Sequence, residues 1–162
     1  MRLSVEGIIN TPGGGIEFNE ELDFSDVDFG GVRPAVRPVS VVGTVRNVAG
    51  MLCLAMDVDT VLSCVCDRCG TAFDRPFHTS AERMLATELE DGENDEILLL
   101  DDGAFDLDEL ARESFILDMD TKTLCRTDCR GLCSGCGANL NFEVCRCKKE
   151  VDPRWAALKK LL

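Results

Sequence analysis

The chain has 162 residues, ten of them cysteine, and its 17 Lys+Arg against 30 Asp+Glu give a formal charge of −13. Hydrophobic residues make up 45% of the sequence, which is enough to bury a core and excludes disorder throughout. Because the chain has a single histidine, catalytic chemistry that needs several histidines is excluded. The longest aliphatic run, Ile97 to Leu100, is too short to cross a bilayer. Because the first residues also lack the apolar stretch of a secretory signal, we expect a cytoplasmic protein with reduced thiols.

Residues 1–35 form an N-terminal segment of mixed character, with a turn at Thr11–Gly15 and acidic and apolar residues after it. The triple glycine of that turn is not followed by Gly-Lys-Ser/Thr, so a phosphate-binding P-loop is excluded.

Residues 36–87 have the pattern of β structure. Apolar and other residues alternate along two segments, which predicts strands near 38–48 and 51–63 joined by a turn at Ala49–Gly50. A further strand is expected between Phe73 and Leu89, after a tight turn at Cys66–Cys69. These segments together predict an antiparallel meander of three or four strands.

The next segment begins with an acidic stretch, residues 88–96, which we expect to be a solvated loop. Ile97 to Leu100 predicts a short strand. Asp106, with Glu109 three residues later, is typical of a helix N-terminus, so a helix is expected near 106–117. Four apolar residues share one face of this helix and predict ordinary packing: Leu107, Leu110, Ala111 and Phe115.

The C-terminal part differs in charge and composition. Residues 122–160 hold nine Lys+Arg and four acids, which gives +5, whereas the remainder is −18. Residues 125–147 contain six cysteines and few aliphatic residues, a composition for which metal coordination usually replaces a core. Asp152 and Pro153 predict the start of a short final helix. We therefore expect an α+β protein: an antiparallel β-rich body over residues 36–120 and a small zinc-binding lobe over residues 121–162.

The cysteine spacing predicts two structural zinc ions. A C-x2-C turn lets two thiolates converge on one ion, and Zn²⁺ takes four such ligands. The C-x2-C pair Cys133/Cys136 and the C-x-C pair Cys145/Cys147 make one complete set. The other proposed set joins two pairs that are distant in the sequence: Cys66, Cys69, Cys125 and Cys129. Cys64 remains an alternative ligand for this set, because it is expected on the same strand face as Cys66. Cys53 is expected to be a buried thiol without a metal role.

Catalysis by these cysteines is disfavoured. A catalytic zinc keeps an open position and usually has histidine or carboxylate ligands, whereas His78 lies outside the cysteine clusters. A redox C-x-x-C at Cys66–Cys69 lacks the surrounding βαβ pattern. We therefore expect no enzymatic activity and keep a zinc-dependent redox or regulatory module as the alternative function.

Several motifs follow one another in a distinctive order. They are Cys66-Asp-Arg-Cys69, Ile97 to Leu100 followed by Phe105-Asp-Leu-Asp-Glu-Leu, Cys125-x3-Cys129-Arg-Gly-Leu-Cys133-x2-Cys136-Gly-Ala-Asn-Leu-Asn141, Cys145-x-Cys147 and Asp152-Pro-Arg-Trp-x2-Leu158. Together they resemble the YceD family, the large ribosomal RNA subunit accumulation proteins. The resemblance covers about residues 36–162 and implies a bacterial or plastid factor, not an enzyme, that supports accumulation of large-subunit rRNA.

The expected partners follow from the charge distribution and from this resemblance. Basic residues crowd the cysteine-rich segment, as in zinc knuckles that grip RNA, although stacking aromatics are scarce there. We expect contact with large-subunit rRNA or a pre-ribosomal particle, or contact of the acidic body with a basic ribosomal protein. We do not expect the protein to bind a membrane or a small-molecule substrate. The candidate binding residues are Arg126, Arg130, Arg146, Lys148 and Lys149.

Overall fold

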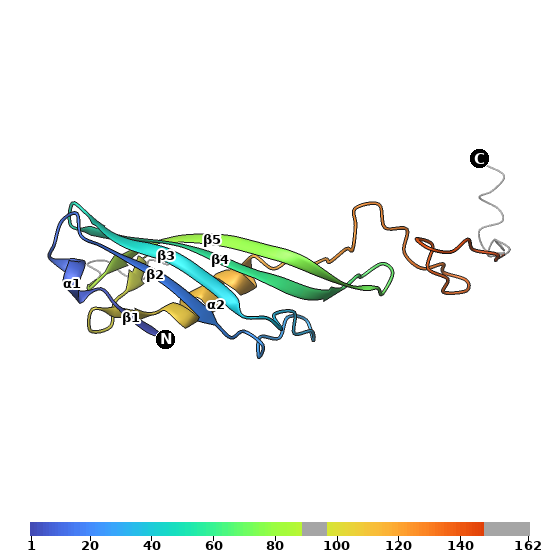
Figure 1. Ribbon diagram of the computed structural model, residues 1–162, viewed down its shortest axis with the longest axis horizontal. Helices are drawn as coiled ribbons and strands as arrows, with labels where there is room; N and C mark the ends of the chain where they lie inside the picture. Colours follow the sequence, from blue (N-terminus) through green and yellow to red (C-terminus); the bar gives the residue numbers. More distant parts are fainter. Residues whose placement is uncertain (89–96, 148–162) are drawn as a thin grey trace, which may run out of the picture. The chain divides into compact units, whose positions relative to one another are not determined.

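The computed structural model describes residues 1–88 and 97–147, and the chain divides into two compact units (Figure 1). The sheet unit comprises Met1–Cys64 and Phe73–Thr121. The cysteine unit comprises Val65–Ala72 and Lys122–Leu162. The acidic stretch at 89–96, Lys148, Lys149 and the final helix predicted from Asp152 lie outside the described residues.

The sheet unit is organised around one five-stranded sheet of order β2-β3-β4-β5-β6. The β2–β3 and β3–β4 pairs are antiparallel, and β6 runs parallel to the end of β5. A second sheet pairs β1 (Arg2–Ser4) with β7 (Ala104–Asp106), and α1 (Glu6–Ile9) follows β1. The strands of the main sheet are β2 (Gly15–Leu22), β3 (Val39–Val48), β4 (Met51–Val65), β5 (Ala72–Ala86) and β6 (Ile97–Leu99).

The strands predicted from alternation are confirmed. β3 and β4 meet at the predicted turn, where Ala49 (φ 54°) and Gly50 (φ 94°) both have left-handed backbone, as a two-residue hairpin with matched twist requires. On β4 the apolar residues that alternate along the strand take the core face: Leu52, Leu54, Met56 and Val58. Cys53 therefore lies on the opposite face, paired with Arg46 of β3 and half-buried, so the expectation that its thiol is buried is wrong.

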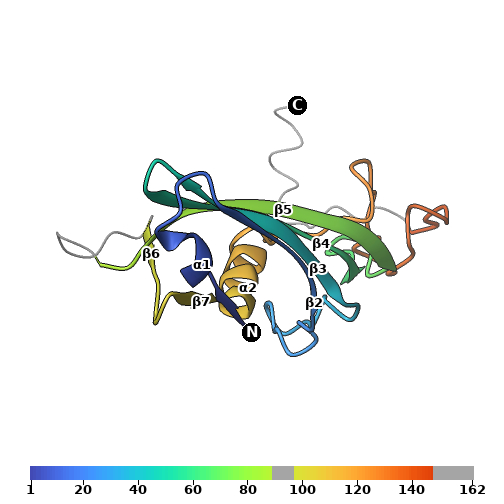
Figure 2. The same ribbon diagram turned by 60° about the vertical axis from the view of Figure 1, so that its left-hand side comes forward.

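The helix α2 (Leu107–Leu117) packs on one face of the sheet (Figure 2). The Asp106 carboxylate accepts hydrogen bonds from the backbone N–H groups of Asp108 and Glu109, which confirms the predicted N-cap. All four residues of the predicted apolar face are buried. The Phe115 ring contacts those of Phe24 and Phe77 at centroid distances of 5.4 and 4.9 Å, so the core forms between the helix and the sheet.

β2 has no counterpart among the predicted strands. Its core face carries Ile16, Phe18 and Leu22, but Glu20 interrupts the series, and the other face carries a glycine, an asparagine and two glutamates. Because polar residues of β2 lie on both faces, the alternation of its apolar residues cannot be recognised in the sequence. Over residues 1–88 and 97–147, no helix is long and apolar enough to cross a membrane.

Candidate metal centres

The cysteine unit brings eight thiols into two groups of four. In each group the sulfur atoms all lie within 4.8 Å of one another. We name them centre one and centre two, and they contain the same sets that the spacing predicted. Centre one is Cys66, Cys69, Cys125 and Cys129; centre two is Cys133, Cys136, Cys145 and Cys147.

The first pair of centre one comes from the loop that joins β4 to β5. The Cys66 N–H donates to the Thr71 carbonyl (3.0 Å), and the Gly70 N–H donates back to the Cys66 carbonyl (2.8 Å). Gly70, with φ 66°, provides the left-handed turn that lets the chain return. This loop closes around the sulfurs of Cys66 and Cys69, and both residues are buried.

The second pair of centre one is held against this loop by hydrogen bonds within the cysteine unit. The Asp67 N–H donates to the Thr123 carbonyl (2.9 Å), and the Thr123 N–H donates to the Asp67 carboxylate (2.6 Å). Cys125 and Cys129 follow. The Sγ–Sγ distances are 3.8 Å for Cys66–Cys129 and 3.7 Å for Cys69–Cys125.

Centre two repeats the same loop. The Gly137 N–H donates to the Cys133 carbonyl (2.9 Å), the Cys133 N–H donates to the Ala138 carbonyl (2.8 Å), and Gly137 has φ 73°. Cys145 Sγ lies 3.1 Å from Cys133 Sγ and 3.8 Å from Cys136 Sγ. Cys136 and Cys147 are exposed, so this centre is more accessible to solvent than centre one.

The thiols of each group differ in acidity. The backbone N–H of Cys125 is the main cause that lowers the pKa of Cys66 to about 6, and that of Cys136 similarly lowers the pKa of Cys133 to about 6. Burial, followed by the neighbouring sulfurs, raises the pKa of Cys125 to about 12. The Cys136 thiol and then that of Cys145 raise the pKa of Cys147 to about 12. In each group one thiol is therefore more acidic and another less acidic than an ordinary cysteine, and four thiolates so close together would need a cation to offset their charges.

The donor sets fit a tetrahedral zinc ion. Four sulfurs at about 2.3 Å from one Zn²⁺ lie about 3.8 Å from one another. Of the four Sγ–Sγ distances below 4.0 Å, three, at 3.7, 3.8 and 3.8 Å, match that edge, and the Cys133–Cys145 distance of 3.1 Å is shorter. Each group supplies four thiols, which leaves no open coordination position, so the arrangement suits a structural ion and not a catalytic one.

Cys64, the alternative ligand, is not part of either group. It is buried in the core of the sheet unit, and burial raises the pKa of its thiol. Among the candidate binding residues, Arg126, Arg130 and Arg146 are exposed. The Arg126 guanidinium donates to Asn141 Oδ1 (2.8 Å) and lies 3.4 Å from the Asp128 carboxylate.

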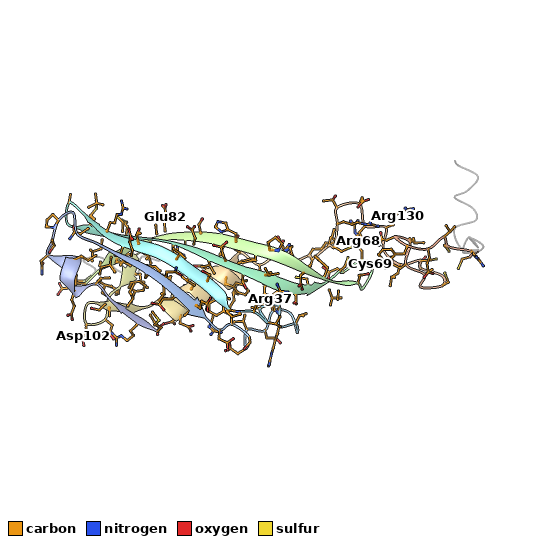
Figure 3. All side chains as sticks on the ribbon, viewed as in Figure 1. Arg37, Arg68, Cys69, Glu82, Asp102 and Arg130 are labelled. Carbon is orange, nitrogen blue, oxygen red and sulfur yellow. The ribbon has the colours of Figure 1, made fainter. Side chains whose placement is uncertain are left out.

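Sequence analysis missed four residues near centre one. Arg68, between two cysteines of centre one, donates to the Cys129 carbonyl (3.1 Å), and Figure 3 labels it beside Cys69. Thr71 Oγ1 is 3.3 Å from Cys69 Sγ. Asn139 and Asn141 follow the second C-x2-C turn, and Asn141 Nδ2 donates to Cys129 Sγ (3.3 Å). The Asn-Leu-Asn string directly after that turn was the available signal.

A family model described as large ribosomal RNA subunit accumulation protein YceD matches residues 54–162, a range that includes both centres. The chain belongs to the YceD family. The resemblance inferred from the motifs is therefore confirmed, and the α+β fold with a cysteine-rich lobe that was expected is the fold of this YceD protein.

Mycobacterial proteins are among its relatives. Uncharacterized proteins of Mycobacterium bovis and Mycobacterium tuberculosis are 36% identical over 70 residues, which is 43% of this chain and 34% of theirs. An uncharacterized protein of Mycobacterium leprae is 26% identical over 129 residues, which is 77% of this chain and 59% of that protein. The chain thus spans between about a third and three fifths of the length of these relatives. No solved structure matches it.

Proposed function

We propose that this YceD protein is a cytoplasmic ribosome-biogenesis factor, not an enzyme, that supports accumulation of large-subunit rRNA and carries two structural zinc ions. The observation that carries the proposal is the pair of closed four-cysteine centres inside the region that matches the family model. A bound Zn²⁺ would be held by the four cysteines of each centre and would cross-link them.

The role of zinc is to take the place of a hydrophobic core. In the described part of the cysteine unit, the buried residues are three cysteines and one glycine: Cys66, Cys69, Cys129 and Gly131. No large apolar side chain is buried among them. A segment of this kind folds when its thiolates bind metal, so metal-binding free energy becomes folding free energy.

The role of the folded cysteine unit is to present cations to a polyanion. Arg68 and Arg126 are held by hydrogen bonds to Cys129 and Asn141, and the side chains of Arg130 and Arg146 are exposed. Anchored guanidinium groups lose little conformational entropy on binding. Phosphate oxygens of folded rRNA are the ligands that such groups suit.

Two specific observations favour other candidates. Cys136 and Cys147 are exposed, which favours the zinc-dependent redox or regulatory module, since accessible thiolates react with oxidants. A hollow of about 660 Å³ on the sheet unit is lined in part by Glu17, Asp57 and Glu82, which favours contact with a basic ribosomal protein. The experiment below separates both candidates from rRNA docking.

The test replaces Arg126, Arg130 and Arg146 by Gln. The matched control replaces Arg33, Arg46 and Arg83 of the sheet unit by Gln, so both variants lose three positive charges. We expect the first variant to keep its metal but to lose roughly tenfold in co-sedimentation with pre-ribosomal particles, because about three phosphate contacts disappear. Mature large-subunit rRNA should fall in cells that carry only this variant. The control variant should behave like the parent.

Equal co-sedimentation of the two variants would contradict rRNA docking by the cysteine unit. If the control variant instead gains co-sedimentation, binding depends on the acidic sheet unit and the partner is a basic protein. Normal rRNA levels in both variants, with thiols that turn over under oxidant, would support the redox alternative.

A further inference from the structure

Asn141 lies beside centre one with all four hydrogen-bonding positions of its side-chain amide in use. Its Oδ1 accepts from the Arg126 guanidinium and from the Arg130 N–H, both at 2.8 Å. Its Nδ2 donates to Asn139 Oδ1 (2.9 Å) and to Cys129 Sγ (3.3 Å). An asparagine can make no more than these bonds, so the direction of its donor toward the sulfur is fixed by the network.

A second contact joins the same segment to another ligand of centre one. Asn139 Nδ2 donates to Thr71 Oγ1 (3.3 Å), and Thr71 Oγ1 lies 3.3 Å from Cys69 Sγ. Asn139 Oδ1 also accepts from the Asn141 N–H (3.1 Å), so the two asparagines hold each other. This asparagine pair therefore contacts Cys129 directly and is linked to Cys69 through Thr71, so it reaches both halves of centre one.

The asparagine pair is placed by the hairpin that carries two ligands of centre two. Leu132 bridges Asn139 across this hairpin, and the Leu140 N–H donates to the Gly131 carbonyl (2.9 Å). The turn at the tip of the hairpin, between those partners, carries Cys133 and Cys136. A metal ion in centre two fixes the tip of the hairpin, and the hairpin fixes the asparagines.

We propose that Asn141 is a positioning residue that couples the two centres, so that loading of centre two strengthens metal binding at centre one. The inference rests on the proposed metal function. Hydrogen bonds from outside the ligand set orient thiolates and commonly change metal affinity 10- to 100-fold. The coupling is reciprocal, because two sites that share one network change each other's affinity by the same factor.

The experiment measures Co²⁺ affinity at centre one by thiolate-to-cobalt charge-transfer absorbance in competition with a chelator. Four proteins form a double-mutant cycle: the parent, N141A, a variant with Cys133→Ser and Cys136→Ser, and the combination. We expect the affinity of centre one to fall roughly tenfold in N141A and in the serine variant, and the combination to lose little more than either. The charge-transfer band of centre one should move to lower energy in N141A, because a thiolate that loses an N–H donor holds its electrons less tightly.

Two further variants keep the result decisive. N139A leaves both ligand sets whole and cuts the same link, so it should weaken centre one roughly tenfold without weakening centre two directly. Val144, which is 88% exposed in the same unit, supplies the control V144A, which should match the parent. Additive losses in the cycle, or less than a twofold effect of N141A with an unmoved band, would overturn the coupling. A parent chain without any charge-transfer band would instead overturn the metal proposal itself.

Discussion

Asn47 uses its side-chain amide in the sheet unit much as Asn141 does in the cysteine unit. It is 2% exposed, and its Nδ2 donates to the carbonyls of Ile8 and Ile9, both at 2.8 Å. Its Oδ1 accepts from the Gly50 N–H (2.8 Å). The buried Asn47 amide thus provides hydrogen-bond partners for backbone groups of α1 and of the hairpin turn. These bonds tie α1 to the β3–β4 hairpin.

Sequence reasoning found the cysteines that converge in each centre but not the residues that support them. C-x2-C spacing reports cysteine convergence directly, because the geometry of the turn lies within four residues. Asn141 and Arg68 depend on contacts between segments 12 and 61 residues apart in the chain. No local pattern encodes such contacts, so these residues became visible only once the cysteine unit was folded.

His78 provides a pH-dependent prediction at the scale of one residue. Its Nδ1 lies 2.9 Å from the Asp59 carboxylate, which raises the pKa of His78. Because the folded pKa is raised, the pair stabilises the fold below the unfolded value of about 6.5 and this contribution disappears as the pH rises through the folded value. NMR titration of the only histidine should give a midpoint above about 6.5.

D59N should return that midpoint toward the ordinary value, whereas D102N, on the turn before β7, should leave it unchanged. A midpoint that is the same in the parent and in D59N would show that the ion pair does not form in solution.

At the scale of elements, periodicity worked where one face of a strand is uniformly apolar. β3, β4 and β5 were predicted within a few residues of their observed ends, and α2 was predicted from its cap and its apolar face. The segment before residue 36 contains β2, in which Glu20 interrupts the alternation. Pairing with β3 stabilises this strand through backbone bonds, which side-chain pattern alone does not report.

Contact between α2 and the sheet gives the prediction at this scale. F115A removes a ring that is 0% exposed and that packs against Phe24 and Phe77. The free energy of unfolding should fall by about 3–5 kcal/mol, because a cavity forms between the helix and the sheet. Urea unfolding followed by far-UV circular dichroism measures the change.

The matched control on the same helix is L117A, whose side chain is 71% exposed. It should change the free energy of unfolding by no more than about 0.5 kcal/mol. Similar losses in the two variants would mean that α2 does not pack on the sheet through Phe115.

At the scale of the whole molecule, each of the two units is stabilised internally by a different kind of interaction. The sheet unit buries a continuous set of apolar side chains, whereas the described part of the cysteine unit buries mainly cysteines of centre one. Chelation should therefore act on one unit alone. Protein purified without chelator should hold about two Zn²⁺ per chain. After zinc removal, amide hydrogen exchange should rise across 65–72 and 122–147 and stay slow in β3, β4 up to Cys64, and α2.

Retention of protection in both units after complete zinc removal would contradict this account. So would a preparation that contains no metal and has disulfides by mass spectrometry, and a preparation with iron in place of zinc would reassign the ion. C69S should reproduce the exchange increase at Cys125–Cys129, whereas C133S should act first on residues 130–147.

The sequence separation within centre one has a consequence for biosynthesis. Its sulfur pairs join residues 56 and 63 positions apart, whereas those of centre two are 9 and 12 apart. At about 5–20 residues per second, Cys66 and Cys69 leave the ribosome several seconds before their partners. During that interval the nascent chain carries an incomplete metal site. Closing a loop of about 60 residues also restricts the unfolded chain by roughly 4 kcal/mol in the loop-entropy treatment of cross-links, against about 3 kcal/mol for centre two. Translation of Cys125 and Cys129 thus completes centre one, whose cross-link closes a longer loop than that of centre two.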